Sequence, residues 1–529
     1  MRVKFLVSVA LPAVLIAGCS QQGGSSASYQ SRPQEVASAD YAGMPENTER
    51  YAKNDVAAVR SVAQEPVSTF AVDVDTAAYA NVRRFLTLGQ VPPKDAVRSE
   101  ELINYFRYDY PAPSDRGAPF SVTTDVAQTP WNPETRLLRV GLRGYDLARS
   151  QRPPANLVFL VDVSGSMDEP DKLPLVKQAL GLVAENMKAG DHVSIAVYAG
   201  AAGVVLEPTA SAAEVRNALN NLSAGGSTAG GEGIQLAYAL ARENFREDGV
   251  NRVILASDGD FNVGVTDQTQ LEQLIEKNRD DGITLTVLGF GQGNLNDSMM
   301  ESIADKGNGN YAYVDGIDEA RKVLDTELAS TLFTIAKDVK VQVEFNPAEV
   351  SQYRLIGYEN RALREEDFKN DKVDAGDIGA GHQVTAIYEI VPAGSKGWLP
   401  DRHFVANRRS ETSGEGSGGG ELAQVRLRYK LPNGGPSRLI TRPVEASQLQ
   451  GAPLPSGDLA FAVAVAGFAQ KLRGDDLLGE WSFGDIKRLA GNQWGFSQQA
   501  RWRSEFLHLV DLAAGQNRTA SVPQEDRPL

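Results

Sequence analysis

The sequence is poor in the residues that hold soft metals and that form covalent cross-links. Its 529 residues include one cysteine and four histidines, His192, His382, His403 and His508. A single cysteine excludes an intramolecular disulfide and a zinc site of the CxxC type, and no two histidines have HExxH spacing. A formal net charge of −15 argues against nucleic acid as a partner, because phosphate backbones require a basic face.

The one cysteine stands at the end of an apolar N-terminal stretch. Residues 5–18 follow a short basic region and are too few to span a membrane comfortably. The stretch ends in Leu15-Ile16-Ala17-Gly18-Cys19-Ser20, which resembles the lipobox of bacterial lipoproteins. We therefore expect a signal peptide over residues 1–19 and a lipid anchor on Cys19; the alternative is an ordinary signal peptide with an incidental cysteine. Ser20 resembles the outer-membrane sorting signal, which implies an anchor in the outer membrane that faces the periplasm.

The segments outside the centre of the chain differ in composition and periodicity. Residues 20–65 are rich in Gly, Ser, Gln and charged residues, which predicts a flexible tether. Residues 66–150 contain short strand and helix patterns, which predict a small α+β domain. Beyond residue 335 apolar positions recur with a period of two, so residues 336–514 are predicted to form a β-rich domain that ends in helices. The last segment, residues 515–529, is predicted to be disordered.

Residues 154–335 alternate between apolar strands and amphipathic helices. Strands are predicted at residues 157–163, 193–198, 253–256, 283–290 and 311–314, with residues 204–206 as a short edge strand. Helices are predicted at residues 173–187, 213–222, 234–245, 270–279 and 319–332. Continuously apolar strands that alternate with helices indicate a parallel sheet covered on both faces. The central region is therefore predicted to have an α/β fold.

Oxygen-bearing side chains follow three of these strands and loops. The first strand ends in Asp162-Val163-Ser164-Gly165-Ser166, Thr228 follows two glycines before a helix, and Asp258 follows the strand at residues 253–256. Ligands of α/β sheets bind at the carboxyl ends of strands, so these side chains are expected at one edge. Carboxylate and hydroxyl oxygens suit Mg²⁺ or Mn²⁺ and not soft metals. The alternative is that these loops only cap helices and turn the chain.

The same five residues, Asp162, Ser164, Ser166, Thr228 and Asp258, resemble the metal ion-dependent adhesion site of von Willebrand factor type A domains. They match it in order and in secondary-structure setting, and the resemblance covers about residues 154–335. It implies a Rossmann-like fold with a central, mostly parallel sheet and helices on both faces. It also implies a Mg²⁺ or Mn²⁺ ion held by these five side chains, with one coordination position open for a partner's carboxylate.

The flanking stretches resemble bacterial YfbK-like lipoproteins. The matching segments are residues 70–85, 92–93, 100–106 and 108–111 at the amino-terminal side, and residues 461–472 and 505–510 near the carboxyl end. Asp73 and Asp75 form a DxD pair within the first segment. Helix capping and hydrogen bonding to the neighbouring chain explain this pair better than a second metal site does.

These features together predict a lipid-anchored binding protein of the bacterial cell envelope and not an enzyme. Its expected partner is an envelope protein that offers an Asp or Glu carboxylate to the bound cation. A metal-dependent hydrolase is the second hypothesis, but no general base is evident beside the loops, and the GxSxG, P-loop and HExxH motifs are absent. A structural envelope scaffold with an unused metal site is the third.

Overall fold

The computed structural model describes residues 47–520, except residues 74, 115–116, 227–229, 260–267, 328–329, 331, 401–419 and 492–498. Cys19 with the predicted signal peptide, Thr228 and the end of the predicted disordered tail lie outside the described residues. Among the helices that are described, none is both long and apolar enough to cross a membrane.

A six-stranded sheet forms the centre of the chain, in the order β10-β9-β8-β5-β6-β7. Its strands are β5 (Ala155–Asp162), β6 (His192–Tyr198), β7 (Ala202–Thr209), β8 (Val250–Ser257), β9 (Thr284–Phe290) and β10 (Tyr311–Val314). All neighbours pair in parallel except β7, which lies antiparallel to β6 at the edge. The predicted parallel sheet with an added edge strand is therefore confirmed.

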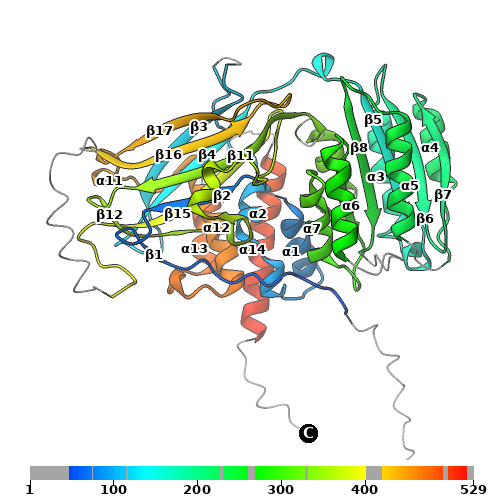
Figure 1. Ribbon diagram of the computed structural model, residues 1–529. Coiled ribbons are helices and arrows are strands. Elements are labelled where there is room, and N and C mark those ends of the chain that lie inside the picture. The colour runs from blue at the N-terminus through cyan, green and yellow to red at the C-terminus, as the bar shows by residue number, and fades with distance from the viewer. Residues whose placement is uncertain are drawn as a thin grey trace, which may run out of the picture. The chain divides into compact units, whose positions relative to one another are not determined.

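Helices cover both faces of this sheet (Figure 1). They are α3 (Leu173–Glu185), α4 (Ala212–Asn220), α5 (Gly230–Glu243), α6 (Gln268–Asp280), α7 (Asp297–Lys306) and α8 (Ile317–Arg321). Alternate residues of β5 point to opposite faces, as the pleat of a strand requires. Phe159 packs in one apolar cluster with Val176 of α3, whereas Leu160 packs in another with Ile234 of α5. Burial on both sides explains why β5 is continuously apolar.

The two flanking stretches build their sheets together. One sheet has the order β1-β12-β15-β4-β3, and the other has the order β13-β2-β11-β16-β17, with β14 paired to β11. The strands before the central domain are β1 (Arg60–Ser61), β2 (Val67–Ala71), β3 (Phe120–Gln128) and β4 (Arg136–Gly144). Those after it are β11 (Thr334–Phe345), β12 (Val350–Leu355), β13 (Ala362–Leu363), β14 (Ile378–Gly379), β15 (Gln383–Pro392), β16 (Glu421–Lys430) and β17 (Arg438–Glu445).

Pairing between these stretches differs from the expectation of separate flanking domains. Strand β2 pairs with β11 so that Phe70 lies opposite Val341, and β4 pairs with β15 so that Val140 lies opposite Ala386. The sheets also contact each other, since the rings of Phe345 and Tyr388 lie 5.4 Å apart. The central domain is thus inserted into a composite domain, because neither flank alone supplies every strand of either sheet.

Helices from both flanks also share a core. They are α1 (Ala77–Thr87), α2 (Ser99–Asn104), α12 (Gly457–Arg473), α13 (Phe483–Gly491) and α14 (Ala500–Ala520), with the short α11 (Ser447–Gln450) beside β3. In Figure 1 α1, α2, α12, α13 and α14 lie side by side. Phe106 of the first flank packs edge-to-face on Phe461 and Phe506 of the second. Gly467 lies against Trp481 so closely that a Cβ there would come within 2.0 Å of the indole ring.

Four segments depart from the predicted elements, one of them at the carboxyl end, where α14 continues to Ala520 within the predicted disordered tail. Residues 47–65 were expected to belong to the tether, but they lie on the folded chain and include β1, which pairs with β12. Helix α7 was not predicted as a helix. The helix predicted over residues 319–332 is instead the short α8 followed by a π-helix over Lys322–Thr326, in which the Glu327 amide donates to the Lys322 carbonyl at 2.9 Å.

Candidate metal centre

Asp162 is the last residue of β5 and is fully buried at the carboxyl end of the sheet. Its Oδ1 accepts a hydrogen bond from the Ser164 amide at 2.9 Å, which bends the chain back toward the carboxylate. Its Oδ2 accepts one from the Ser257 hydroxyl of β8 at 3.1 Å. The Ser164 and Ser166 hydroxyls lie 3.1 Å apart in the following turn. The DxSxS loop therefore gathers one carboxylate and two hydroxyls, as the sequence predicts.

Asp258 lies beside this loop because β8 is hydrogen-bonded to β5. It is fully buried, and its Oδ2 accepts hydrogen bonds from Lys172 Nζ at 2.9 Å and from Asn294 Nδ2 at 3.0 Å. Lys172 Nζ also donates to Asn294 Oδ1 at 3.2 Å. The second predicted carboxylate is thus held by an ammonium and an amide.

The loop that precedes Thr228 packs directly on the DxSxS turn. The Gly225 amide donates to the Val163 carbonyl at 2.7 Å, and the Gly165 amide donates to the Gly226 carbonyl at 3.0 Å. Gly226 has a φ of +91°, in the left-handed region that favours glycine. Thr228 itself is outside the described residues. Of the five predicted ligands, the structure brings together Asp162, Ser164, Ser166 and Asp258.

The two carboxyl groups differ in their electrostatic surroundings. Burial raises the pKa of Asp162 to about 6, although hydrogen bonds from Ser164 and Ser257 oppose the rise. Burial also acts to raise the pKa of Asp258, but hydrogen bonds from Asn294 and Lys172, together with the Lys172 charge, outweigh it and lower that pKa. Asp258 is therefore a charged carboxylate that is paired with the Lys172 ammonium. Asp162 has no such cation beside it, so it is the carboxylate that a metal ion would stabilise most.

The donor set fits a hard divalent cation. Carboxylate and hydroxyl oxygens are the ligands that Mg²⁺ and Mn²⁺ prefer, and no described sulfur or imidazole contacts these side chains. Asp162, Ser164 and Ser166 would hold the ion from one loop. Asp258 would support it from β8, at the sheet edge where α/β proteins bind ligands.

Lys172, Asn294 and Ser257 are site residues that the sequence analysis missed. Lys172 immediately precedes α3, where a lysine is usually solvated, yet its relative exposure is only 6%. Its aliphatic stem lies against Gly291, where a Cβ would come within 2.4 Å of it. The glycine-rich turn after Phe290 leads into α7, whose N-cap is Asn296. The one sequence feature that accompanies the burial of Lys172 is Gly291, which leaves room for its side chain.

A separate acidic group lies at the opposite side of the central domain. Asp75, Glu101 and Glu301 offer carboxylate oxygens within 4.8 Å of one another. Arg361 lies 3.3 Å from Asp75 and 3.2 Å from Glu301, and Arg98 pairs with Glu101. Asp75 also accepts the Tyr311 amide at 2.7 Å. Because the guanidinium groups of Arg361 and Arg98 already pair with these carboxylates, the cluster serves as a contact between the central and composite domains. Asp75 bonds to the neighbouring chain, as expected, but no side-chain hydrogen bond caps α1.

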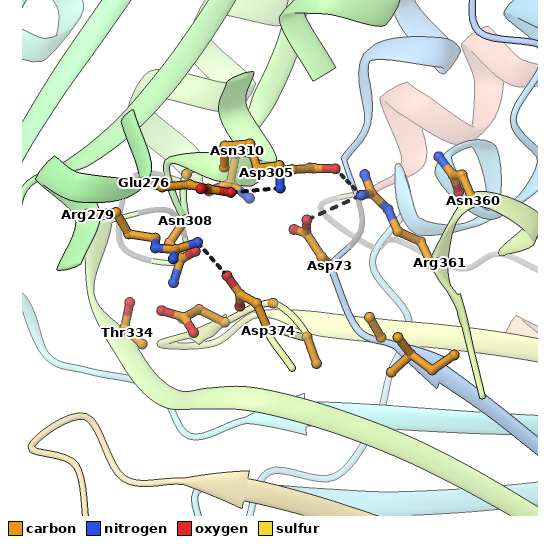
Figure 2. A pocket seen from close by; sticks show the side chains of 18 of the residues that line it. Asp73, Glu276, Arg279, Asp305, Asn308, Asn310, Thr334, Asn360, Arg361 and Asp374 are labelled. Atoms are coloured by element: carbon orange, nitrogen blue, oxygen red, sulfur yellow. Dashed lines mark hydrogen bonds and ion pairs between the residues drawn. The ribbon is translucent and has the colours of Figure 1, made fainter. Parts of the chain in front are cut away.

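A cavity of about 440 Å³ opens beside this cluster. Figure 2 shows Asp73 and Asp305 both pointing toward Arg361, and Arg279 paired with Asp374. Arg252 also lines the cavity, with its guanidinium bonded to the Thr284 and Thr286 hydroxyls. Most charges that line this cavity are neutralised by each other. Asp162 and Asp258 lie at the carboxyl ends of β5 and β8, whereas Arg252 of this cavity lies near the start of β8.

Fold and site together define a von Willebrand factor type A domain protein. Residues 156–326 match the model of the von Willebrand factor type A domain, residues 45–139 match a model named von Willebrand factor, and residues 330–515 match one named "Uncharacterized protein YfbK, C-terminal". The chain belongs to the YfbK family.

Two relatives and one solved structure show the range of this similarity. The "Uncharacterized protein YfbK" of Escherichia coli is 43% identical over 476 residues, which cover 88% of this chain and 81% of that protein. The "Uncharacterized protein sll0103" of Synechocystis is 25% identical, over 63% of this chain and 76% of that protein. The structure of a von Willebrand factor type A protein from Catenulispora acidiphila has a TM-score of 0.39 and 16% identity, over 73% of this chain and 88% of that one.

Proposed function

We propose that this protein is a lipid-anchored binding protein of the bacterial envelope. Mg²⁺ or Mn²⁺ held by Asp162, Ser164, Ser166, Thr228 and Asp258 captures an Asp or Glu carboxylate of a partner protein. The anchor is Cys19, and the outer membrane that faces the periplasm is the proposed location. The single observation that carries this proposal is the ion pair between Lys172 and Asp258.

The ion pair matters because of the charge that it leaves at the loaded site. Two carboxylates, Asp162 and Asp258, neutralise one divalent cation. Lys172, with a side-chain exposure of 7%, adds a positive charge that surrounding water screens little. The loaded site therefore has a net positive charge within an acidic protein, and an anionic ligand is the one that it attracts. A carboxylate is the anion that protein partners offer most readily.

Hydrolysis is the weaker alternative for this site. A metal-bound water needs a general base within hydrogen-bonding reach. The described side chains that bond to Asp162 and Asp258 include serines, Tyr198, Lys172 and Asn294, and Lys172 is already committed to Asp258. These groups position the two carboxylates, and none of them is an imidazole or a free carboxylate, the usual general bases. A scaffold with an unused site remains the third hypothesis, and metal binding separates it from the proposal.

The test is metal binding by the chain without its signal peptide. Mn²⁺ titration followed by calorimetry should show one site in the wild type. Asp162→Asn should abolish it with little change in the melting temperature, because the amide oxygen can still accept the Ser164 amide. Asp168→Asn, which removes an exposed carboxylate next to the loop, is the matched control and should bind as the wild type does. A wild-type chain that binds no Mn²⁺ would refute the proposed function.

A further inference from the structure

The first described residues of the chain lie on a loop that also contacts the metal centre. We name residues 47–61 the N-terminal strap. The Thr48 amide donates to the Gly293 carbonyl at 2.8 Å, the Arg50 amide donates to the Leu295 carbonyl at 2.9 Å, and the Ser298 amide donates to the Arg50 carbonyl at 3.3 Å. The strap thus pairs with residues 293–298, which run from the loop after β9 into the first turn of α7.

Glu49 fixes this pairing from a buried position. Its side-chain exposure is 3%, and its carboxylate accepts two hydrogen bonds from Arg84 of α1, at 2.9 and 3.0 Å. The same carboxylate accepts the Gly293 amide at 2.9 Å and the Tyr51 hydroxyl at 2.9 Å. Loss of such a buried, fully bonded carboxylate leaves several donors unsatisfied. Glu49 therefore ties the loop at residues 293–298 to the composite domain.

The other side of that loop faces the metal centre. Asn294 contacts both members of the Lys172–Asp258 pair. Gly259, next to Asp258, has a φ of +90°, and a Cβ there would lie 2.5 Å from the Asn296 amide nitrogen. The loop is packed against the Asp258 backbone as well as bonded to its side chain. A displacement of residues 293–298 cannot occur without disturbing Asp258.

We infer that the N-terminal strap positions the metal centre: Glu49 holds the loop at residues 293–298, and that loop holds Asn294 against Asp258. The inference rests on the proposed metal-binding function and adds a route by which the chain that leads from Cys19 acts on it. Whatever displaces the strap, including a load on the preceding chain, then lowers metal affinity and with it partner capture. Glu49 is a positioning residue, because it touches neither the ion nor a ligand of the ion.

The experiment is a double-mutant cycle on Mn²⁺ affinity in the chain without its signal peptide. Asn294→Ala removes a group that orients a supporting carboxylate, a loss that typically weakens metal binding by about tenfold or more. Glu49→Ala should weaken it by about threefold to tenfold. In the Asn294→Ala background, Glu49→Ala should have little further effect, because both act through one contact. Lys53→Ala, which removes an exposed ion pair with Asp55 from the same strap, should leave affinity unchanged.

Two further measurements keep the outcomes distinct. Hydrogen exchange without metal should be faster at residues 293–298 in Glu49→Ala than in the wild type. Glu49→Gln should retain part of the wild-type Mn²⁺ affinity, and it replaces the alanine variant in the comparison if that variant folds poorly. Equal Mn²⁺ affinity in wild type and both Glu49 variants would overturn the inference and leave the proposed function intact. A full, additive effect of Glu49→Ala in the Asn294→Ala background would also overturn it. A wild type that binds no Mn²⁺ would refute the proposed function, and the inference with it.

Discussion

Lys172 Nζ lies 2.9 Å from Asp258 Oδ2, and both side chains are buried at the carboxyl end of the central sheet. A lysine ammonium thus occupies one face of a carboxylate that the adhesion-site pattern assigns to the metal. The pair has two opposite effects on binding. It weakens the attraction of the empty site for a divalent cation, and it strengthens the attraction of the loaded site for an anion.

The first prediction separates these two effects with Lys172→Met. Methionine keeps most of the stem that packs on Gly291 and removes the charge. Mn²⁺ should bind more tightly, on the order of tenfold, because Asp258 is no longer neutralised. Acetate should then bind the loaded site more weakly, as measured by the relaxation of water protons on Mn²⁺. Lys177→Met, which removes a half-buried ammonium of α3 that bonds to the Asn220 carbonyl and not to Asp258, is the control; unchanged affinities in Lys172→Met with an intact fold would contradict the charge argument.

The second prediction concerns the anchor. Cys19→Ala should prevent lipidation, so that the protein is either retained as precursor or released into the periplasmic fraction. Labelled palmitate should enter the wild type and not the variant, because the Cys19 thiol is the acceptor in the proposed anchor. The measurement is radiolabel in the immunoprecipitated protein, with fractionation of the same cells. Equal labelling of both proteins would contradict the lipobox interpretation.

Local patterns predicted the central domain well because its signals are local. Buried parallel strands are apolar on both faces, so β5 contains a continuous apolar run over residues 157–161 at its observed position. The DxSxS loop follows directly from the end of β5. These features depend on neighbours in sequence, and the fold brings Asp162, Ser164, Ser166 and Asp258 together as expected.

What the sequence did not predict depends on contacts between distant residues. The pairing of Phe70 with Val341 joins strands on either side of the whole central domain, and no local period encodes such a partner. Lys172 and Glu49 are charged residues in polar segments, where local patterns give no sign of burial. Both are buried because a distant opposite charge, Asp258 or Arg84, neutralises them. Composition therefore assigned residues 47–65 to the tether although they pack on the fold.

The third prediction concerns acid stability and His382. Burial, with the nearby charge of Arg107, lowers the pKa of His382 to about 4, whereas an unfolded histidine titrates near 6.5. Below about pH 6.5 the unfolded chain binds a proton that the folded chain does not, so stability falls as the pH falls from about 6.5 to about 4. The lowered pKa of His382 is expected to reduce the free energy of unfolding by up to about 3 kcal/mol over this pH range.

His382→Gln should remove that component. The free energy of unfolding, from urea denaturation at pH 7.5 and pH 4.5, should decrease less in the variant than in the wild type. His508→Gln, on the exposed face of α14, serves as the control and should retain the wild-type difference. An unchanged pH difference in His382→Gln would show that the imidazole is protonated equally in both states.

The last prediction concerns how partner capture reaches the composite domain. The segment after β10 is clamped to α1, because Arg83 pairs with Asp315 at 2.5 Å and with Glu319 of α8 at 2.7 Å. Tyr105 also donates to Glu319, at 2.6 Å. The π-helix over Lys322–Thr326 follows at once, and π-helical turns occur frequently at functional sites. The segment thus has a fixed end followed by an irregular turn, and it leads toward β11.

If a partner carboxylate completes the coordination sphere, capture should require both the metal and this carboxylate. EDTA, Asp258→Ala and Thr228→Ala should each reduce the partner recovered by crosslinking in living cells, by a similar factor. A partner that binds one arrangement of this segment better than another shifts the equilibrium toward that arrangement, with a coupling free energy of about 1–3 kcal/mol. Hydrogen exchange over Ile317–Thr326 should therefore respond to partner plus Mg²⁺ and not to Mg²⁺ alone, while α4 serves as the internal reference. Partner recovery that survives chelation and both substitutions would show that the metal centre has no part in recognition.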